Sequence, residues 1–73
     1  MKGYRIYETR KELVDEFEET TVLRNYPVSD IYLKQEQAEK EMSKLKPHYE
    51  GNPINCWSEG VGFYIEEVNI VDD

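Results

Sequence analysis

Few residues in this chain could perform acid–base or nucleophilic chemistry. His48 is the only histidine and Cys56 is the only cysteine, so a histidine base or a cysteine nucleophile would have to use these two. His48 follows Pro47, just after the expected end of a helix, where a solvated imidazole is the ordinary outcome. We expect Cys56 to be a small buried residue beside Trp57, because no glycine-rich turn or helix N-terminus is expected next to it to activate the thiol.

Adjacent carboxylates are the other candidates for acid–base chemistry or for binding a hard metal ion. Such pairs include Glu18 and Glu19, Glu66 and Glu67, and Asp72 and Asp73. Neighbouring residues of a strand point to opposite faces, so Glu66 and Glu67 cannot share a site without a bulge. The sequence contains no EF-hand spacing, P-loop or dinucleotide-binding glycine motif. We therefore expect no enzyme, no cofactor and no metal site.

The composition limits the class of protein further. The chain has 73 residues, which fit a single domain over residues 1–73. Sixteen Asp and Glu against nine Lys and Arg give a net charge of −7, which disfavours direct binding to nucleic acid. Six Tyr, two Phe and one Trp argue for a folded chain and against disorder. The sequence has no apolar run that could span or anchor in a membrane, and the single cysteine fits a reducing cytoplasm.

The N-terminal part predicts one strand and one ambiguous element. Alternating apolar and polar residues predict a strand over residues 2–8. Thr9 and Glu12 have the spacing of a capping box, which favours a short helix over residues 10–19. Two basic residues in its first turn and four closely spaced carboxylates oppose this helix. A second strand or a wide acidic turn is therefore the alternative.

The middle of the chain predicts strands followed by a helix. Residues 20–33 are rich in β-branched and aromatic side chains and are interrupted by one proline, which indicates one or two strands. The clearest helix covers residues 34–46, where Ala38, Met42 and Leu45 recur at spacings of four and three. We expect these three side chains to pack onto the sheet.

The C-terminal part predicts a loop and a final strand. Residues 47–60 contain two Pro, two Gly and two Asn, which indicates a loop, with a short strand through residues 54–57 as an option. The last strand covers residues 61–71, and its apolar phase shifts at Glu66 and Glu67, which indicates a bulge. The elements together predict an α+β fold with a small antiparallel or mixed β-sheet of three to four strands and one or two helices packed on one face.

Three segments also carry a family resemblance. Residues 30–33 read DIYL and lead into residues 36–39, which read EQAE, while residues 62–68 read GFYIEEV. In these features the last two thirds of the chain resemble small uncharacterised α+β domains of phages and prophages. In those domains a strand leads into a helix containing Glu and Ala, and a final strand of this type closes the sheet. The resemblance implies that fold and a viral context, and it implies no chemistry.

The aromatic and acidic residues together suggest a role in recognition. Six Tyr and one Trp exceed what so small a core can bury, and exposed Tyr and Trp are frequent in protein interfaces. Carboxylates that repeat along a helix or strand can imitate a row of phosphates, although solubility alone also explains an acidic surplus. We expect a non-enzymatic interaction module, a phage or prophage protein that inhibits a host or defence protein by occluding a basic, nucleic-acid-binding site. The candidate partner-binding residues are Glu12, Asp15, Glu16, Glu19, Tyr49, Trp57, Glu59 and Glu66.

Two alternatives stay open. The aromatic loop around Tyr49 and Trp57 could bind a small ligand or a nucleotide, because flat side chains with polar tips suit such ligands. A third hypothesis is an accessory subunit that is stable only as a homo-oligomer, because a core of this size leaves little stability to spare.

Overall fold

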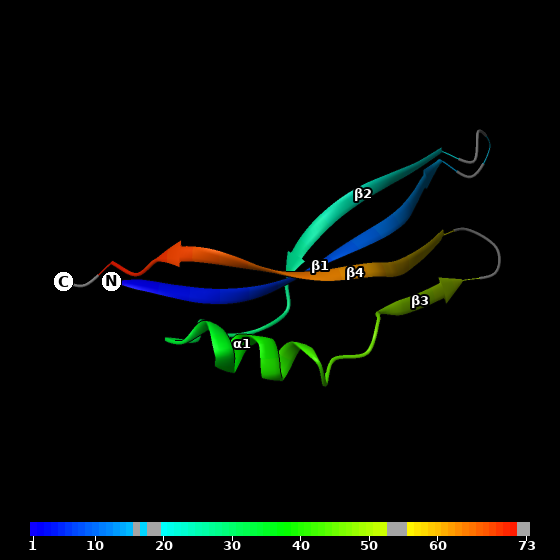
Figure 1. Ribbon diagram of the computed structural model, residues 1–73. Helices are drawn as coiled ribbons and strands as arrows, with labels where there is room; N and C mark the ends of the chain where they lie inside the picture. The colour runs from blue at the N-terminus through cyan, green and yellow to red at the C-terminus, as the bar shows by residue number, and fades with distance from the viewer. Residues whose placement is uncertain (16, 18–19, 53–55, 72–73) are drawn as a thin grey trace.

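The fold is a four-stranded antiparallel sheet with one helix (Figure 1). The computed structural model describes residues 1–15, 17, 20–52 and 56–71. The elements in chain order are β1 (Lys2–Asp15), β2 (Thr20–Pro27), α1 (Gln35–Met42), β3 (Tyr49–Asn52) and β4 (Cys56–Asn69). The strand order is β2-β1-β4-β3, so the two longest strands form the centre and the shorter ones form the edges. In Figure 1 the end of β1, the start of β2, the end of β3 and the start of β4 lie at the same end of the molecule, beyond α1.

The first strand is confirmed, but it continues well past the expected boundary. Residues 10–15 belong to β1, so the helix expected over residues 10–19 is wrong in this part and the strand alternative is correct. Residues 16, 18 and 19 lie outside the described residues. Along this stretch β1 pairs with β2 on one side, where Arg10 is opposite Arg24, and with β4 on the other side, where Glu12 is opposite Ser58. Backbone bonds to two partners outweigh a local capping signal.

The central pair of strands contains a bulge, although not where the sequence indicated. The register of β1 and β4 is unbroken from Lys2 opposite Asn69 to Thr9 opposite Gly62, so the bulge expected at Glu66 and Glu67 is wrong. The register shifts instead between Thr9 and Arg10, because Arg10 is opposite Gly60. The apolar phase changes near the C-terminus for another reason, namely that Ile70 approaches Gly3 on the sheet face opposite the helix.

The segment after β2 stays at the edge of β1. Tyr32 and Tyr4 exchange two backbone hydrogen bonds, each 2.7 Å long, and the Val28 amide donates to the Ile6 carbonyl at 3.0 Å. Ser29 Oγ accepts a hydrogen bond from the Ile6 amide at 3.0 Å. Residues 28–33 therefore add a single β-bridge to the edge of the sheet and do not form a second strand.

The helix is confirmed near its centre and is shorter than expected. The range 34–46 was predicted, whereas α1 ends at Met42. Lys44 and Leu45 then follow in tight turns whose amides bond three residues back. Ala38 is fully buried and Met42 is partly buried, as expected, but Leu45 is 36% exposed. The prediction for Leu45 is wrong because the helix ends before this side chain can reach the sheet.

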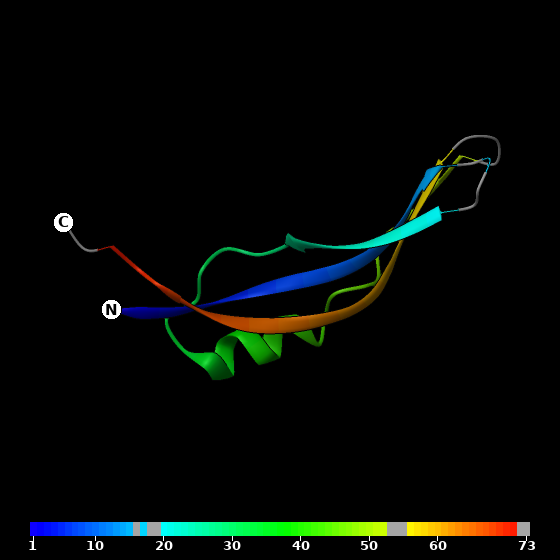
Figure 2. The ribbon, with the colours of Figure 1, turned by 90° about the horizontal axis from the view of Figure 1, so that it is seen from above.

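The helix covers only one side of the sheet (Figure 2). Tyr4, Ile6 and Glu8 face α1 and the chain that follows it, since Tyr4 lines a hollow with α1 and Glu8 contacts His48. Side chains alternate along a strand, so the intervening residues of β1 face the other way. We call that side the uncovered face. Its residues on the strands include Arg5, Tyr7 and Lys11, with Leu23, Tyr49, Glu59, Tyr64 and Glu66 in register beside them.

The core is correspondingly small. Among the described residues, Ile6 and Ala38 are the only fully buried hydrophobic side chains. In the same part of the chain, no helix has the length and apolar content needed to cross a membrane.

The different environments of Ala38 and Leu45 give a test of this packing. Ala38→Asp places an unpaired carboxylate between α1 and the sheet and should lower the free energy of unfolding by at least about 2 kcal/mol. Leu45→Asp keeps its charge in water and should cost less than about 1 kcal/mol. Urea unfolding followed by circular dichroism compares the two variants. Equal losses of stability would show that the helix does not pack through Ala38.

Candidate functional site

The most buried polar group of the described structure is the Glu8 carboxylate, which is 2% exposed. Its Oε2 accepts a hydrogen bond from the backbone amide of His48 at 2.9 Å, and its Oε1 accepts one from Arg10 Nε at 2.7 Å. The His48 carbonyl accepts a bond from the Gly60 amide at 2.7 Å. Glu8 therefore joins β1 and β4 to the chain that returns from α1, and its charge is balanced by Arg10.

A glycine makes room for this carboxylate. A Cβ atom at Gly60 would collide with the Glu8 carboxylate and would lie 2.9 Å from the His48 amide nitrogen. Gly62, two residues along, has open space at the same position. The bulge of β4 lies between these two glycines. At Gly60 the strand passes close to the Glu8 carboxylate, whereas at Gly62 it does not.

The polar contacts continue from Glu8 toward β2. The Arg10 guanidinium lies over the Tyr26 ring, 4.8 Å from its centroid. The Tyr26 hydroxyl donates to Glu12 at 2.7 Å, and Arg24 Nε lies 3.6 Å from the same carboxylate. Two carboxylates and two guanidinium groups thus alternate on the helix side of the sheet, and each charge has an opposite neighbour. This arrangement fastens β2 to β1 beyond the end of the helix.

The structure describes the chemical candidates of the sequence only in part. His48 contacts Glu8 through its backbone, and its imidazole Nε2 lies 3.8 Å from Glu50. Ser58 Oγ is buried and has no hydrogen-bond partner within the described residues. The side chain of Cys56 lies outside the described residues. Among the residues that are described, no group of three or more His, Cys, Asp or Glu is arranged to hold a metal ion.

The strand register gathers most of the expected partner-binding residues at one end of the sheet. Glu12 and Glu50 both oppose Ser58, and Tyr49 opposes Glu59 in the neighbouring row. The backbones of Asp15 and Trp57 belong to the same end, where they oppose Thr20 and Gly51. We call this region the distal end: residues 10–15, 20–24, 49–52 and 56–60. Glu16 and Glu19 lie outside the described residues, as do the side chains of Asp15 and Trp57.

Glu66 is separated from the rest of the set. It opposes Arg5 near the other end of β1 and lies on the uncovered face, whereas Glu12 lies on the helix side. The adjacent Glu67 faces the helix side and pairs with Lys2 at 3.0 Å, a contact that raises the pKa of the Lys2 amine above its usual value. Adjacent glutamates therefore occupy opposite faces, as strand geometry predicts.

The distal-end residues differ in how available they are. The Tyr49 residue is 75% exposed and the Glu50 side chain 83% exposed, and Glu59 is also exposed. Glu12 is engaged by Tyr26 and Arg24, as described above, so it supports the sheet more than it presents charge. The sequence analysis missed Glu50 and Glu8. The alternation of Glu8, Arg10 and Glu12 at every second residue was the available signal for the polar network.

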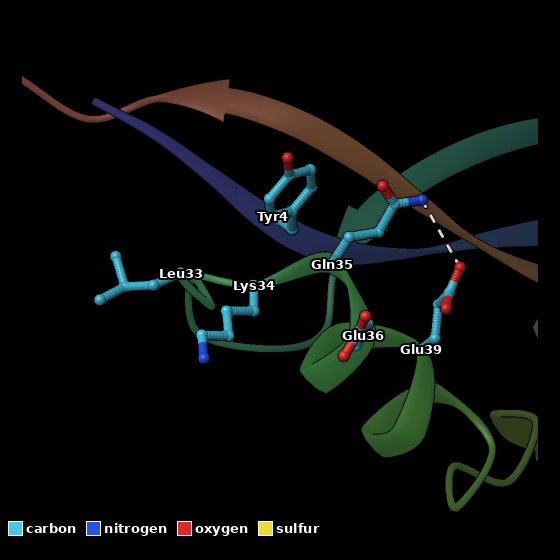
Figure 3. Close-up of a pocket in the computed structure, with 6 residues that line it drawn as sticks. All are labelled: Tyr4, Leu33, Lys34, Gln35, Glu36 and Glu39. Atoms are coloured by element: carbon cyan, nitrogen blue, oxygen red, sulfur yellow. Dashed lines mark hydrogen bonds between the residues drawn. The ribbon is translucent and has the colours of Figure 1, made fainter.

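A hollow of about 670 Å³ lies near the start of α1 (Figure 3). It is lined by Tyr4, Leu33, Lys34, Gln35, Glu36 and Glu39. Gln35 Nε2 lies 3.5 Å from Glu39 Oε1 at its rim. Its lining does not include Tyr49, on which the ligand-binding hypothesis was based, and the side chain of Trp57 lies outside the described residues.

The uncovered face has an aromatic centre. The rings of Tyr7 and Tyr64 are stacked, with centroids 5.5 Å apart and planes inclined by 13°. Desolvation, the Glu66 carboxylate and Tyr7 raise the pKa of the Tyr64 hydroxyl above its usual value of 10. Leu23 on β2, which is in register with Lys11 on the same face, is 65% exposed. Such a surface resembles the middle of a protein interface more than a solvated sheet face.

No family model, curated protein or solved structure matches this chain. Its function must therefore be inferred from the groups described above.

Gly60, which lies beside Glu8, and Gly62, which lies opposite Thr9 on the other face, provide a matched test of the buried carboxylate. Gly60→Ala forces Glu8 or the His48 backbone to move and should lower the free energy of unfolding by about 1 to 3 kcal/mol. Gly62→Ala adds the same methyl group in open space and should change stability by less than about 0.5 kcal/mol. Thermal unfolding of both variants measures the difference. A Gly60→Ala protein as stable as the Gly62→Ala control would contradict the close contact.

Proposed function

We propose that the protein is a non-enzymatic protein-binding module and that its distal end contacts a partner with a basic surface. The observation that carries this proposal is the strand register, which sets Tyr49 and Glu59 in one row and Glu50 and Glu12 in the next. These rows lie beyond α1, at the end where the β1–β2 and β3–β4 pairs splay apart (Figure 1).

The charge of the chain supports a basic partner. A net charge of −7 attracts a positive surface over roughly 8 Å at physiological ionic strength, which raises the rate of encounter. Glu50 and Glu59 present their carboxylates to solvent. Tyr49 offers a large and nearly rigid contact surface that loses little conformational entropy on binding.

The narrower proposal concerns the kind of partner. Carboxylates that take the place of phosphates would occlude a nucleic-acid-binding site without any catalytic group. The resemblance of the last two thirds of the chain to phage and prophage domains supports a host or defence protein as the target. Under this proposal the protein inhibits by occupying the basic site.

The experiment is a capture from host lysate at low and high salt with two charge-reversed baits. Glu50→Lys should reduce recovery of the partner about tenfold or more, because like charges oppose the contact. Glu36→Lys makes the same change in net charge on α1 and should retain the partner. Recovery with the unchanged protein should fall as salt rises, and added DNA should compete with it.

Three outcomes would contradict the proposal. The first is that the unchanged protein captures no partner at either salt concentration. The second is that both charge-reversed baits lose the partner equally, which would mean that net charge alone governs the capture. The third is a captured partner that DNA cannot displace, which would exclude occlusion of a nucleic-acid site while leaving binding at the distal end.

A further inference from the structure

The molecule exposes more surface than a free monomer of its mass normally does. Its accessible surface is 5708 Å², whereas monomers of 8.7 kDa expose about 4,700 Å². The excess of about 1,000 Å² is close to the roughly 800 Å² that each partner buries in a standard interface. The radius of gyration points the same way, since it is 15.1 Å and a compact chain of this length has about 11 Å.

The uncovered face is a broad surface of the sheet that the helix does not cover. The helix packs on the opposite side (Figure 2). The stacked Tyr7 and Tyr64 lie at the centre of the face, and the exposed Leu23 lies further along it, in register with Lys11. The molecule measures 47 × 26 × 14 Å, so this broad side has room for an interface of standard size.

The charges on the face are balanced although the chain as a whole is acidic. Arg5 is in register with Glu66, and Lys11 is in register with Glu59. Within the described residues, no ion pair joins Arg5 or Lys11 to a carboxylate, and Arg5 Nε is buried without a hydrogen-bond partner. The ion pairs of the two central strands, such as Lys2 with Glu67 and Arg10 with Glu8, lie on the helix side.

The charges of this face indicate what kind of partner would bind it. An acidic surface would favour a basic partner, but this face has no net charge along its central strands and therefore does not. A surface of the same kind, with its two signs exchanged in position, would satisfy both charges. We infer that the uncovered face is an interface between two copies of this chain.

The register specifies how two copies would meet. The two copies are related by a two-fold axis that runs parallel to the strands, midway between β1 and β4 and just above the uncovered face. Rotation about this axis sets β1 of each copy over β4 of the other. Because Arg5 opposes Glu66 and Lys11 opposes Glu59 in one chain, this operation sets each cation over the matching carboxylate of the second copy. Tyr7 meets Tyr64 by the same operation. The product is a two-layer sandwich with the sheets about 10 Å apart and their strands nearly aligned.

Tyr49 and Glu59 lie where the uncovered face reaches the distal end, so the dimer covers them and narrows the proposed partner contact to Glu50. Glu50 lies on the helix side of the same end and stays exposed in the dimer, so a basic partner could still bind there. Arg5 and Glu66, which test the dimer, lie away from the distal end. Failure of the dimer would therefore leave the partner capture to be judged on its own result.

Sedimentation equilibrium of the full chain tests the inference directly. The unchanged protein should be a dimer at micromolar concentration. Arg5→Glu alone and Glu66→Arg alone each place two like-charged contacts in the interface and should raise the dissociation constant about 100-fold or more. Glu67→Arg makes the same change at the next residue, on the helix side, and should leave the dimer intact.

A mixture of the two single variants separates contacts between chains from effects within one chain. Arg5→Glu and Glu66→Arg each keep a like-charged neighbour on their own sheet, so any local destabilisation persists in the mixture. In a heterodimer of the two, one contact joins the introduced glutamate to the introduced arginine, and the other joins the original Glu66 to the original Arg5. Mixing should therefore bring the dissociation constant back to within about tenfold of the unchanged protein.

The contrary results are equally clear. A protein that stays monomeric up to several hundred micromolar would overturn the inference. So would a dimer that survives both single reversals, or two folded single variants that fail to associate when mixed. Circular dichroism of each variant establishes that it is folded before its association is scored.

Discussion

The helix α1 has eight residues and is therefore about 12 Å long. The molecule whose sheet it covers extends over 47 Å. This mismatch governs the rest of the structure. The helix buries Ile6 and Ala38 near the middle of the chain's two longest strands and cannot reach further along them. The distal end and most of the opposite side of the sheet, away from Gly3 where Ile31 and Ile70 pack, therefore need other means of stabilisation.

At the distal end the means are polar. Glu8 receives bonds from Arg10 and from the His48 backbone, and Tyr26 and Glu12 extend the same network toward β2. Such a network holds the strands in register only if each charge is matched, because an unpaired buried carboxylate would destabilise the fold. The close passage of Gly60 beside Glu8 follows from this requirement. The polar network therefore holds in register the same strands that carry the exposed carboxylates of the distal end.

Local patterns in the sequence predicted part of this arrangement. Alternation predicted the first strand, and the spacing of Ala38 and Met42 predicted the helix, because these signals depend on near neighbours. Residues 10–15 were assigned to a helix because their partners, β2 and β4, are distant in sequence and supply backbone bonds that no local pattern reveals. Leu45 was misplaced for a related reason, since the sequence does not show where helical bonding ends.

The candidate site shows the same division. Composition identified Tyr49, Glu59 and Glu12, and only the register of four strands shows that they share one end of the sheet. Glu66 was grouped with them by residue type, yet it lies opposite Arg5 at a different place. The importance of Glu8 could not be read from its type, because the burial of a carboxylate depends on the bulge and on the chain returning from α1.

The central claim is that this single-layer sheet is completed by a second copy of the chain. The dependence of thermal unfolding on protein concentration tests that claim most directly, because dissociation then accompanies unfolding. We expect the midpoint temperature measured by circular dichroism to rise steadily as the protein concentration is raised from about 1 to 100 μM. A midpoint that stays constant over this range, with reversible unfolding, would contradict the account.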